Sequence, residues 1–373
     1  MSELFDFLKY CLGAKSDVNK MIAGIDWQML YSFASKQALL GLCFDGIERL
    51  GKEYPEELKL NPIGRELLMT WMGKAQQIRR QNVKVNGVAA KLYSKFREDG
   101  LRCCILKGQG NALMYPNPYS RTSGDIEVWV NASREEITEY AKCHFNLEDD
   151  IRFHHLETTM DGVPVELHFF PCTMNNPLYH ARLQKWFKRN ADLQCSNVVC
   201  LPDGIGEIAI PTTAFNVVYQ LTHLYHHFFD EGIGMRQIID YYYVVISDYL
   251  LVINDESLGI RDTLQKELKH LGLWKFAGAV MYVLHKALGL PEEKMIAPMD
   301  EKRGKLLLTE ILNGGNFGKH FTKYGHFTQQ GMAKKYFLKI WRNMHFVRYF
   351  PAEALSEPIF RTWHFFWRLK HRR

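Results

Sequence analysis

The stretch that decides the fold is residues 105–130, which read ILKGQGNALMYPNPYSRTSGDIEVWV. A glycine-containing turn, Gly108–Gly110, is followed by two acids, Asp125 and Glu127, with one hydrophobic residue between them. Alternate side chains of a strand point to the same face, so the two acids are expected to project together while their apolar neighbours face a core. Two adjacent carboxylates repel each other, and a hard divalent cation would relieve that repulsion. The pattern therefore predicts a Mg²⁺ site.

Length and composition are those of an ordinary globular protein. The chain has 373 residues, of which 47% are hydrophobic and 24% charged, with a formal net charge of +6. That length allows two domains. No apolar run reaches the roughly 18–20 residues that a membrane-spanning helix needs, and the nearest candidate, 241–253, is interrupted by Asp248. The eight cysteines form no Cys-x-x-Cys pair and no secretory signal precedes them, which favours a reducing, cytoplasmic location.

The spacing of hydrophobic residues along the sequence divides the chain into three parts. Helical spacing predominates over 1–95, strand-like alternation with one helix occupies 96–210, and helical spacing returns over 211–373. The expected class is α+β, with a small mixed sheet between N-terminal helices and a C-terminal helical domain. The last part ends in a basic tail, 368–373, which could touch nucleic acid or anionic lipid or could simply be solvated.

The same patterns predict individual elements. Ser133 followed by Glu136 has the form of a capping box and predicts a helix over 133–142. Proline at 351 and 358 is expected to break the chain before a last helix at 360–369. Strands are expected over 101–106, 125–130, 152–160 and 163–170, and further helical segments over 5–12, 27–39, 77–97, 111–114, 212–229, 235–253, 260–270, 273–288, 300–312 and 331–345.

The Asp-Gly pair at 161–162 predicts a two-residue hairpin between two of these strands. That turn sets Glu157 opposite Glu166 and His155 opposite His168, all on one polar face. If the hairpin lies beside the preceding strand with this face on the same side, Glu166 joins the two acids there. Three carboxylates on adjacent strands can hold two metal ions.

Simpler interpretations exist for each of these residues. Alternating acids also occur on the solvated face of a sheet. Glu157 opposite Glu166 is a like-charge pair that needs a cation nearby, which Lys107 or a metal could supply. The histidines of this face are expected to line a cleft or to form hydrogen bonds rather than to bind metal. They are His154, His155 and His168.

A strand, a glycine turn that opens a helix, and Asp-hydrophobic-Asp/Glu on a second strand together resemble the polymerase-beta nucleotidyltransferase superfamily. The ordered set of motifs resembles more closely the bacterial "uncharacterised nucleotidyltransferase" family, over residues 20 to 350. The elements that carry this resemblance are Leu106-Lys107-Gly108, Tyr115-Pro116, Arg121, Asp125-Ile126-Glu127, Glu166-Leu167-His168, and Gly234-Met235-Arg236-Gln237 before Asp240. The chain departs from the family in having glutamate at 127 and 166 and Gly-Gln-Gly at 108–110.

The resemblance implies transfer of a nucleoside monophosphate from an NTP to an acceptor hydroxyl, with pyrophosphate leaving. The acceptor could be a small molecule, a protein side chain or a nucleic-acid end. Mg²⁺ or Mn²⁺ would be held by Asp125, Glu127 and Glu166, the implied catalytic residues, and Glu166 could take the proton of the acceptor. The implied nucleotide-binding residues are Lys107, Gly108, Gln109, Gly110 and Arg121, and the possible cleft residues are His155, His168, His223 and His227.

Several of these assignments leave alternatives open. The glycine turn could be a tight strand-to-helix connection without a ligand. Arg121 could contact the γ-phosphate or bridge to Asp125, whereas Arg236 and Asp240 are spaced as a helical ion pair. The histidines at 223, 226 and 227 have zinc-compatible spacing, but no acid completes the pattern, so they are expected to face the cleft or to pack. The alternative function is a catalytically degenerate nucleotide-binding or interaction protein of the same fold.

Overall fold

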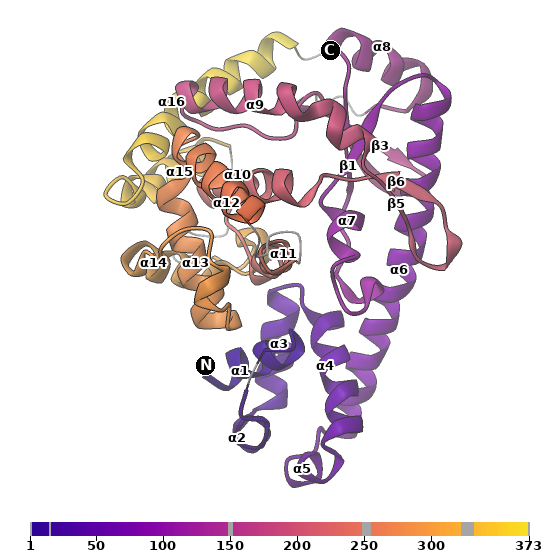
Figure 1. Cartoon of the computed structure of the whole chain (residues 1–373), viewed down its shortest axis with the longest axis vertical. Coiled ribbons are helices and arrows are strands. Elements are labelled where there is room, and N and C mark those ends of the chain that lie inside the picture. Colours follow the sequence, from indigo (N-terminus) through magenta and orange to yellow (C-terminus); the bar gives the residue numbers. More distant parts are fainter. Residues whose placement is uncertain (1, 15, 148–151, 248–254, 322–331, 372–373) are drawn as a thin grey trace.

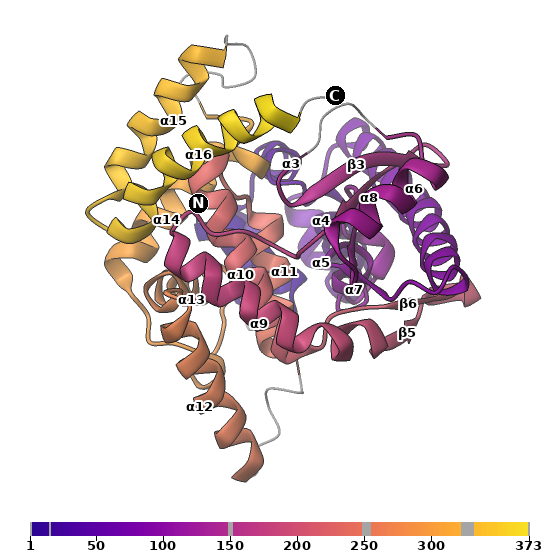
Figure 2. The ribbon, with the colours of Figure 1, turned by 90° about the horizontal axis from the view of Figure 1, so that it is seen from above.

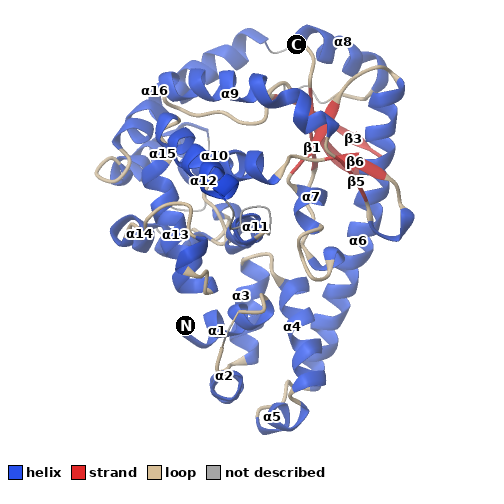
Figure 3. Cartoon of the chain, viewed as in Figure 1, coloured by secondary structure: helices blue, strands red, loops and turns tan. Residues whose placement is uncertain are grey.

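The strands gather in one corner of the molecule and helices form the remainder (Figure 3). The computed structural model describes residues 2–14, 16–147, 152–247, 255–321 and 332–371. The N-terminal helices lie at one end, the long helix α6 runs along one side to the sheet, and the C-terminal helices lie opposite (Figure 1). The predicted α+β class with a small mixed sheet is confirmed.

In the described part of the chain, six helices precede the sheet. The side chains of Asp17 and Asp26 cap α2 and α3 by accepting hydrogen bonds from backbone N–H groups, which explains where these helices begin. Helix α6 begins at Arg65, well before the predicted segment 77–97, and ends at Glu98. The six helices are α1 (Ser2–Cys11), α2 (Val18–Gly24), α3 (Trp27–Lys36), α4 (Leu40–Glu53), α5 (Pro55–Leu60) and α6 (Arg65–Glu98).

Four strands form a mixed sheet in the order β1-β2-β4-β3. They are β1 (Cys103–Leu106), β2 (Ile126–Val130), β3 (His155–Met160) and β4 (Val163–His168). The hairpin of β3 and β4 pairs His155 with His168 and Glu157 with Glu166, so the predicted register is confirmed. Strand β2 lies parallel to β4 and antiparallel to β1, and this parallel pairing sets Glu127 beside Glu166.

One face of the sheet is apolar. Ile126, Val128 and Val130 of β2 are buried together with Val165 and Leu167 of β4, as their alternation with the acids predicts. Helices α6 and α8 contribute to the same core, and Ser133 caps α8 (Arg134–His144) in the predicted capping box. The sequence patterns did not predict three further elements, which are α9 (Pro177–Ser196), β5 (Val198–Cys200) and β6 (Glu207–Ala209).

The C-terminal part is helical, as predicted. The break predicted at Pro351 is present, because α15 ends at Phe346 and α16 begins at Pro351, but the break predicted at Pro358 is wrong, because α16 continues through it. Proline at the first helical position costs nothing, since that residue has no intrahelical N–H bond to lose. The helices are α10 (Thr213–Asp230), α11 (Met235–Ile246), α12 (Asp255–His270), α13 (Trp274–Leu288), α14 (Glu301–Gly314), α15 (Met332–Phe346) and α16 (Pro351–His371).

Short helices complete the fold. They are α7 (Gly108–Ala112) and the 3₁₀ turns η1 (Pro118–Ser120), η2 (Pro202–Gly204), η4 (Glu292–Lys294) and η5 (Asn316–Gly318). Helix α7 begins three residues before the predicted segment 111–114. The ends of two predicted segments, 248–253 and 331, lie outside the described residues.

Two apolar clusters hold these parts together. One lies between the sheet, α6 and α8, and the other joins the N-terminal helices to α10, α11 and α13. Seen from above, α10 and α11 lie between the outer C-terminal helices and the sheet (Figure 2). The division into domains at residues 95 and 210 stays a prediction.

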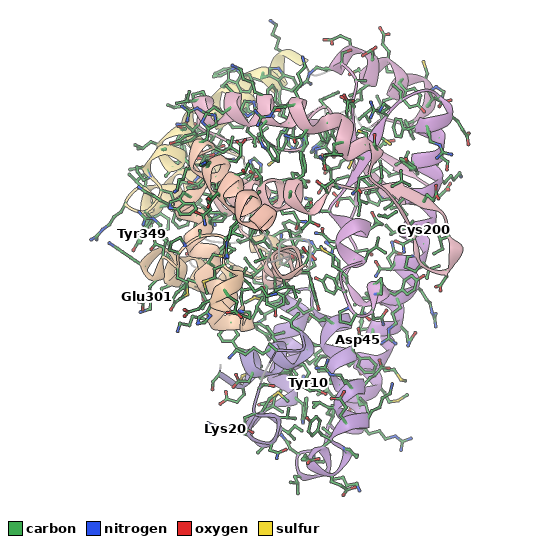
Figure 4. All side chains as sticks on the ribbon, in the orientation of Figure 1. Tyr10, Lys20, Asp45, Cys200, Glu301 and Tyr349 are labelled. Carbon is green, nitrogen blue, oxygen red and sulfur yellow. The ribbon has the colours of Figure 1, made fainter. Side chains whose placement is uncertain are left out.

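The surface carries two of the cysteines, Cys143 and Cys200, and none of the eight forms a disulfide. Cys200 lies at the outer edge of the strand region, on the opposite side of the molecule from Tyr349 and Glu301 of the C-terminal part (Figure 4). Among the described residues, no helix is both long and apolar enough to cross a membrane.

Candidate active site

The acids of β2 and β4 meet on the polar face of the sheet. One carboxylate oxygen from each of Asp125, Glu127 and Glu166 lies within 4.8 Å of the other two. The parallel pairing of β2 with β4 produces this cluster, because it aligns Glu127 with Glu166 and leaves Asp125 at the start of β2. We call these three side chains the carboxylate cluster.

Repulsion inside the cluster is visible in the pKa of Asp125. One side of this residue is open to solvent, but the burial of its carboxylate and the charges of Glu127 and Glu166 raise its pKa to about 6. Lys107 opposes this rise without cancelling it. The cluster thus attracts a cation at neutral pH, which lies above the pKa of Asp125.

Lys107 connects the sheet to helix α10. Its Nζ lies 2.5 Å from Oε1 of Glu127 and 2.5 Å from Nε2 of His223. Tyr219, one turn before His223, donates a hydrogen bond of 3.2 Å to Oε2 of Glu127. Lys107 has a φ of +48°, a conformation that costs a non-glycine residue about 1–3 kcal/mol and persists only where the surroundings hold it.

Histidines and an arginine balance the charge of the hairpin acids. Nε2 of His168 donates to Glu166 at 3.0 Å, and Nδ1 of His155 lies 3.4 Å from the same oxygen. Nε2 of His155 and Nε of Arg152 each lie 3.3 Å from Oε1 of Glu157. Arg152 and His168 thus supply positive charge beside the like-charge pair of Glu157 and Glu166, a role that the sequence left to Lys107 or a metal.

The pKa values of this group follow from burial and hydrogen bonding together. Burial raises the pKa of Glu166, but the hydrogen bond from His168 and the nearby histidines outweigh it and lower the pKa to about 2. Burial lowers the pKa of His168, yet its bond to Glu166 and the charge of Glu127 raise the pKa overall. Glu166 is therefore ionised and His168 is its proton donor.

Arg121 does not reach the carboxylate cluster. Its guanidinium forms a bidentate pair with Asp240, at 2.8 and 2.7 Å, and both side chains are buried. Tyr115 donates a third hydrogen bond to Asp240, at 2.7 Å. A bridge from Arg121 to Asp125 is thus not formed. The predicted ion pair of Arg236 with Asp240 is also wrong, because Arg236 donates to the carbonyl of Thr122 at 2.7 Å.

The glycine turn has a half-buried residue, Gly108, followed by two buried ones. Gly108 has a φ of +24° and lines a cavity beside the carboxylate cluster. Gly110 instead packs on the sheet side, where an added Cβ would lie 3.0 Å from Cγ2 of Ile210. Gln109 is buried in the protein. Close packing thus explains the glycine at 110 without a ligand.

The cavity beside the cluster has a volume of about 50 Å³ and lies between the sheet and α10–α11. That space suits a hydrated cation or one phosphate group, whereas pockets that hold a whole small-molecule ligand have about 300 Å³ or more. Residues that the sequence did not place here are Gln220, Arg236, Gln237 and Phe317. Gln220 lies three residues before His223 on α10, so helical spacing could have found it.

The histidines of α10 point two ways. His223 takes part in the cavity, and Nε2 of His227 lies 3.0 Å from Nε2 of His223. Burial and the charge of Lys107 hold the pKa of His223 well below its ordinary value, so it is neutral. His226 turns away toward Thr173. Among the described residues, none of the three α10 histidines belongs to a group of metal-ligand candidates.

A family model described as "uncharacterised nucleotidyltransferase" matches residues 23–289, which is more than half of the chain. The chain belongs to this family. The match spans the glycine turn, the carboxylate cluster and α10 to α13, so the residues assigned by resemblance all lie within it.

Comparisons with individual proteins show only distant similarity. No curated protein sequence matches the chain. A solved antigenic nucleotidyltransferase-like protein from Paracoccidioides brasiliensis is 15% identical, with a TM-score of 0.29 over 50% of this chain and 91% of that one. A Thermotoga maritima CCA-adding enzyme solved with tRNA is 8% identical, with a TM-score of 0.18 over 83% of this chain and 84% of that one. Neither similarity carries a functional argument.

The donors of this member of the family suit a hard divalent cation. The carboxylate cluster offers oxygen ligands only, the type that Mg²⁺ and Mn²⁺ prefer. The ammonium of Lys107 supplies a positive charge beside Glu127, one of these ligands. A second group, His155 with Glu157 and Glu166, could also hold an ion, but hydrogen bonds already occupy these side chains.

Proposed function

We propose that this protein is a metal-dependent nucleotidyltransferase that moves a nucleoside monophosphate from an NTP to an acceptor hydroxyl. The observation that carries the proposal is the carboxylate cluster, with three acids converging within 4.8 Å on adjacent strands. Family membership supports transfer of a nucleotide in general terms. The metal and the roles of individual residues rest on the geometry of the site.

Asp125, Glu127 and Glu166 would hold Mg²⁺ or Mn²⁺. When bound, the cation neutralises charge on the phosphates and on the leaving pyrophosphate. Lys107, which lines the cavity, would bind a phosphate oxygen, and Gly108 leaves room for the phosphate beside it. Arg121 would act indirectly, because it is occupied by Asp240.

The reaction begins when the oxygen of the acceptor hydroxyl attacks the α-phosphorus of the NTP. A new bond forms between that oxygen and phosphorus, the bond to the β-phosphate oxygen breaks, and pyrophosphate leaves with its electron pair. The proton passes to Glu166, which is ionised at neutral pH. Because a carboxylate with a pKa of about 2 is a weak base, the proton is expected to move late, as the new bond forms.

Two observations favour the alternative of a degenerate nucleotide-binding protein. The ammonium of Lys107 already pairs with Glu127, and the cavity is too small for a nucleotide in its present shape. The two interpretations differ in turnover. In the enzyme, label from an α-labelled NTP moves to an acceptor in a cell extract. In the degenerate protein, NTP binds but no label moves.

Glu166→Gln tests the assignment of the cluster, with Glu157→Gln as the matched control. The two residues face each other on β3 and β4, and only Glu166 belongs to the carboxylate cluster. Glu166→Gln is expected to abolish Mn²⁺ binding measured by calorimetry and to slow transfer by about 10²-fold or more. Glu157→Gln is expected to leave both nearly unchanged. Equal and small effects of the two substitutions would contradict the assignment.

A further inference from the structure

Exposed apolar side chains gather on the last two helices, α15 and α16. Of the nineteen large hydrophobic side chains that are exposed in the described part of the chain, nine belong to these helices. The two helices contain only 15 and 21 of the 373 residues. Single exposed hydrophobic side chains are common on protein surfaces, whereas a concentration of them marks an interaction site.

Most of these side chains follow the helical repeat, so each helix presents them along one side. The members on α15 are Phe337, Trp341 and Met344, and those on α16 are Leu355, Ile359, Trp363, Phe366 and Leu369. We call these eight side chains the apolar stripe. The two helices contact each other and lie on the outside of the C-terminal part (Figure 2). Their inward sides belong to the apolar core, to which Phe346 and Ala354 contribute.

The same segment carries the positive charge of the protein. Residues 332–373 contain ten lysines and arginines and two acids, a formal charge of +8, so the rest of the chain carries −2 of the total of +6. Both acids are buried. Glu353 accepts hydrogen bonds from two backbone N–H groups of the segment before α9, and Glu357 pairs with Arg361. The charge that α15 and α16 present to solvent is therefore basic.

Some of the basic groups have acidic partners and others have none. Lys339 and Arg361 both pair with an acid at the end of α10. Arg348 and Lys370 are exposed, and neither has an ion-pair partner in the described part of the chain. The sequence adds two further arginines at 372–373, outside the described residues. The basic tail, whose role the sequence left open, is thus the end of a helix that also carries the apolar stripe.

Charge and composition together indicate what covers this surface. In a two-fold interface with a second copy of the chain, each patch meets its own counterpart, so the basic groups of the two copies would repel each other. Aromatic and aliphatic side chains combined with lysine and arginine are instead typical of helices that lie in the surface of an anionic bilayer. Tryptophan favours that interface, and the apolar stripe contains two, Trp341 and Trp363.

We propose that α15 and α16 bind the surface of an anionic lipid bilayer. The apolar stripe would enter the boundary between head groups and acyl chains, while Arg348, Lys370 and the basic tail would lie near the lipid phosphates. The helices would lie along the bilayer, because their inward sides remain packed in the core. This proposal concerns where the protein acts and does not depend on nucleotide transfer.

The test is flotation of the full chain with lipid vesicles, either of phosphatidylglycerol and phosphatidylcholine in equal parts or of phosphatidylcholine alone. The anionic vesicles are expected to bind the protein about tenfold more tightly or better, and added salt to weaken that binding, because ions screen the attraction. The double variant Ile359→Ser/Phe366→Ser removes two members of the stripe, which are 73% and 63% exposed. It is expected to weaken binding to the anionic vesicles about tenfold or more.

The matched control is Leu60→Ser/Leu193→Ser, whose side chains are 85% and 60% exposed but lie on α5 and α9. This control should bind the anionic vesicles as the wild type does. If circular dichroism shows that Ile359→Ser/Phe366→Ser alters the fold, Phe337→Ser/Met344→Ser on α15 takes its place, with the same expected loss.

Three results would overturn the proposal. The first is that the wild type binds neither kind of vesicle, or binds both equally. The second is an equal affinity of the stripe variant and the control variant for the anionic vesicles, since charge alone would then account for binding. The third is a dimer in sedimentation velocity that Ile359→Ser/Phe366→Ser dissociates, without vesicle binding by the wild type, which would make this surface an interface between copies.

Discussion

Substituting Arg121 with methionine is expected to destabilise the fold strongly. Arg121 and Asp240 are 6% and 4% exposed, and their side chains are joined by hydrogen bonds of 2.8 and 2.7 Å. The charge of Arg121 also holds the pKa of Asp240 below its ordinary value despite burial. Removing one partner of a buried pair leaves an uncompensated charge, at a cost of about 3–5 kcal/mol. Arg121→Met should lower the free energy of unfolding by that amount.

The assay is urea unfolding of single and double variants followed by circular dichroism. Asp240→Asn alone should also be costly, because it leaves Arg121 charged and unpaired. The double variant Arg121→Met/Asp240→Asn should cost less than the sum of the two single ones, since neither charge remains. Arg189→Met is the surface control, because Arg189 pairs with Glu267 with its side chain 66% exposed, and it should cost less than about 1 kcal/mol.

A different result would refute this reasoning. If Arg121→Met costs less than about 1 kcal/mol while it abolishes binding of an ATP analogue, the arginine acts on the nucleotide and its pairing with Asp240 is incidental. If the double variant loses as much free energy of unfolding as the two single variants together, the side chains of Arg121 and Asp240 are not energetically coupled.

Three further predictions concern other elements. Burial raises the pKa of Glu353 from 4.5 to about 7. Its contribution to the free energy of unfolding is therefore greatest below its pKa in the unfolded state and is lost as pH rises through its pKa in the folded state, by at most roughly 3 kcal/mol. Melting temperatures at about pH 5 and pH 8 should differ less in Glu353→Gln than in the wild type. Gly110→Ala should cost about 1–3 kcal/mol through contact with Ile210, with Mn²⁺ affinity unchanged in calorimetry, whereas lost affinity at wild-type stability would favour a ligand role. Ser133→Ala should cost about 1 kcal/mol in urea unfolding by removing the cap of α8, and no change would show that Glu136 suffices.

Local chemistry allowed much of the sheet to be predicted from the sequence. The Asp-Gly turn at 161–162 specified the pairing of Glu157 with Glu166, because a two-residue loop fixes the register of its strands. The alternation of acids and hydrophobic residues specified which face of β2 is polar. These features depend on residues close together in the chain, and for that reason one sequence was enough to predict them.

The contacts of the acids depended on tertiary structure. Only the parallel pairing of β2 with β4 decides that Glu127 lies beside Glu166, and no local pattern specifies which strands become neighbours. The protein partner of Arg121 is likewise Asp240, 119 residues away in sequence, rather than Asp125.

The sequence by itself determined the strand faces, the hairpin register and the set of acids that could bind a metal. Only the tertiary structure decided that Lys107 bridges Glu127 and His223, and that Glu127, His223 and Arg236 line one cavity. The physical reason is the range of the interactions. Backbone hydrogen bonds and side-chain alternation act between near neighbours, whereas a site formed between a sheet and distant helices depends on how the apolar clusters pack.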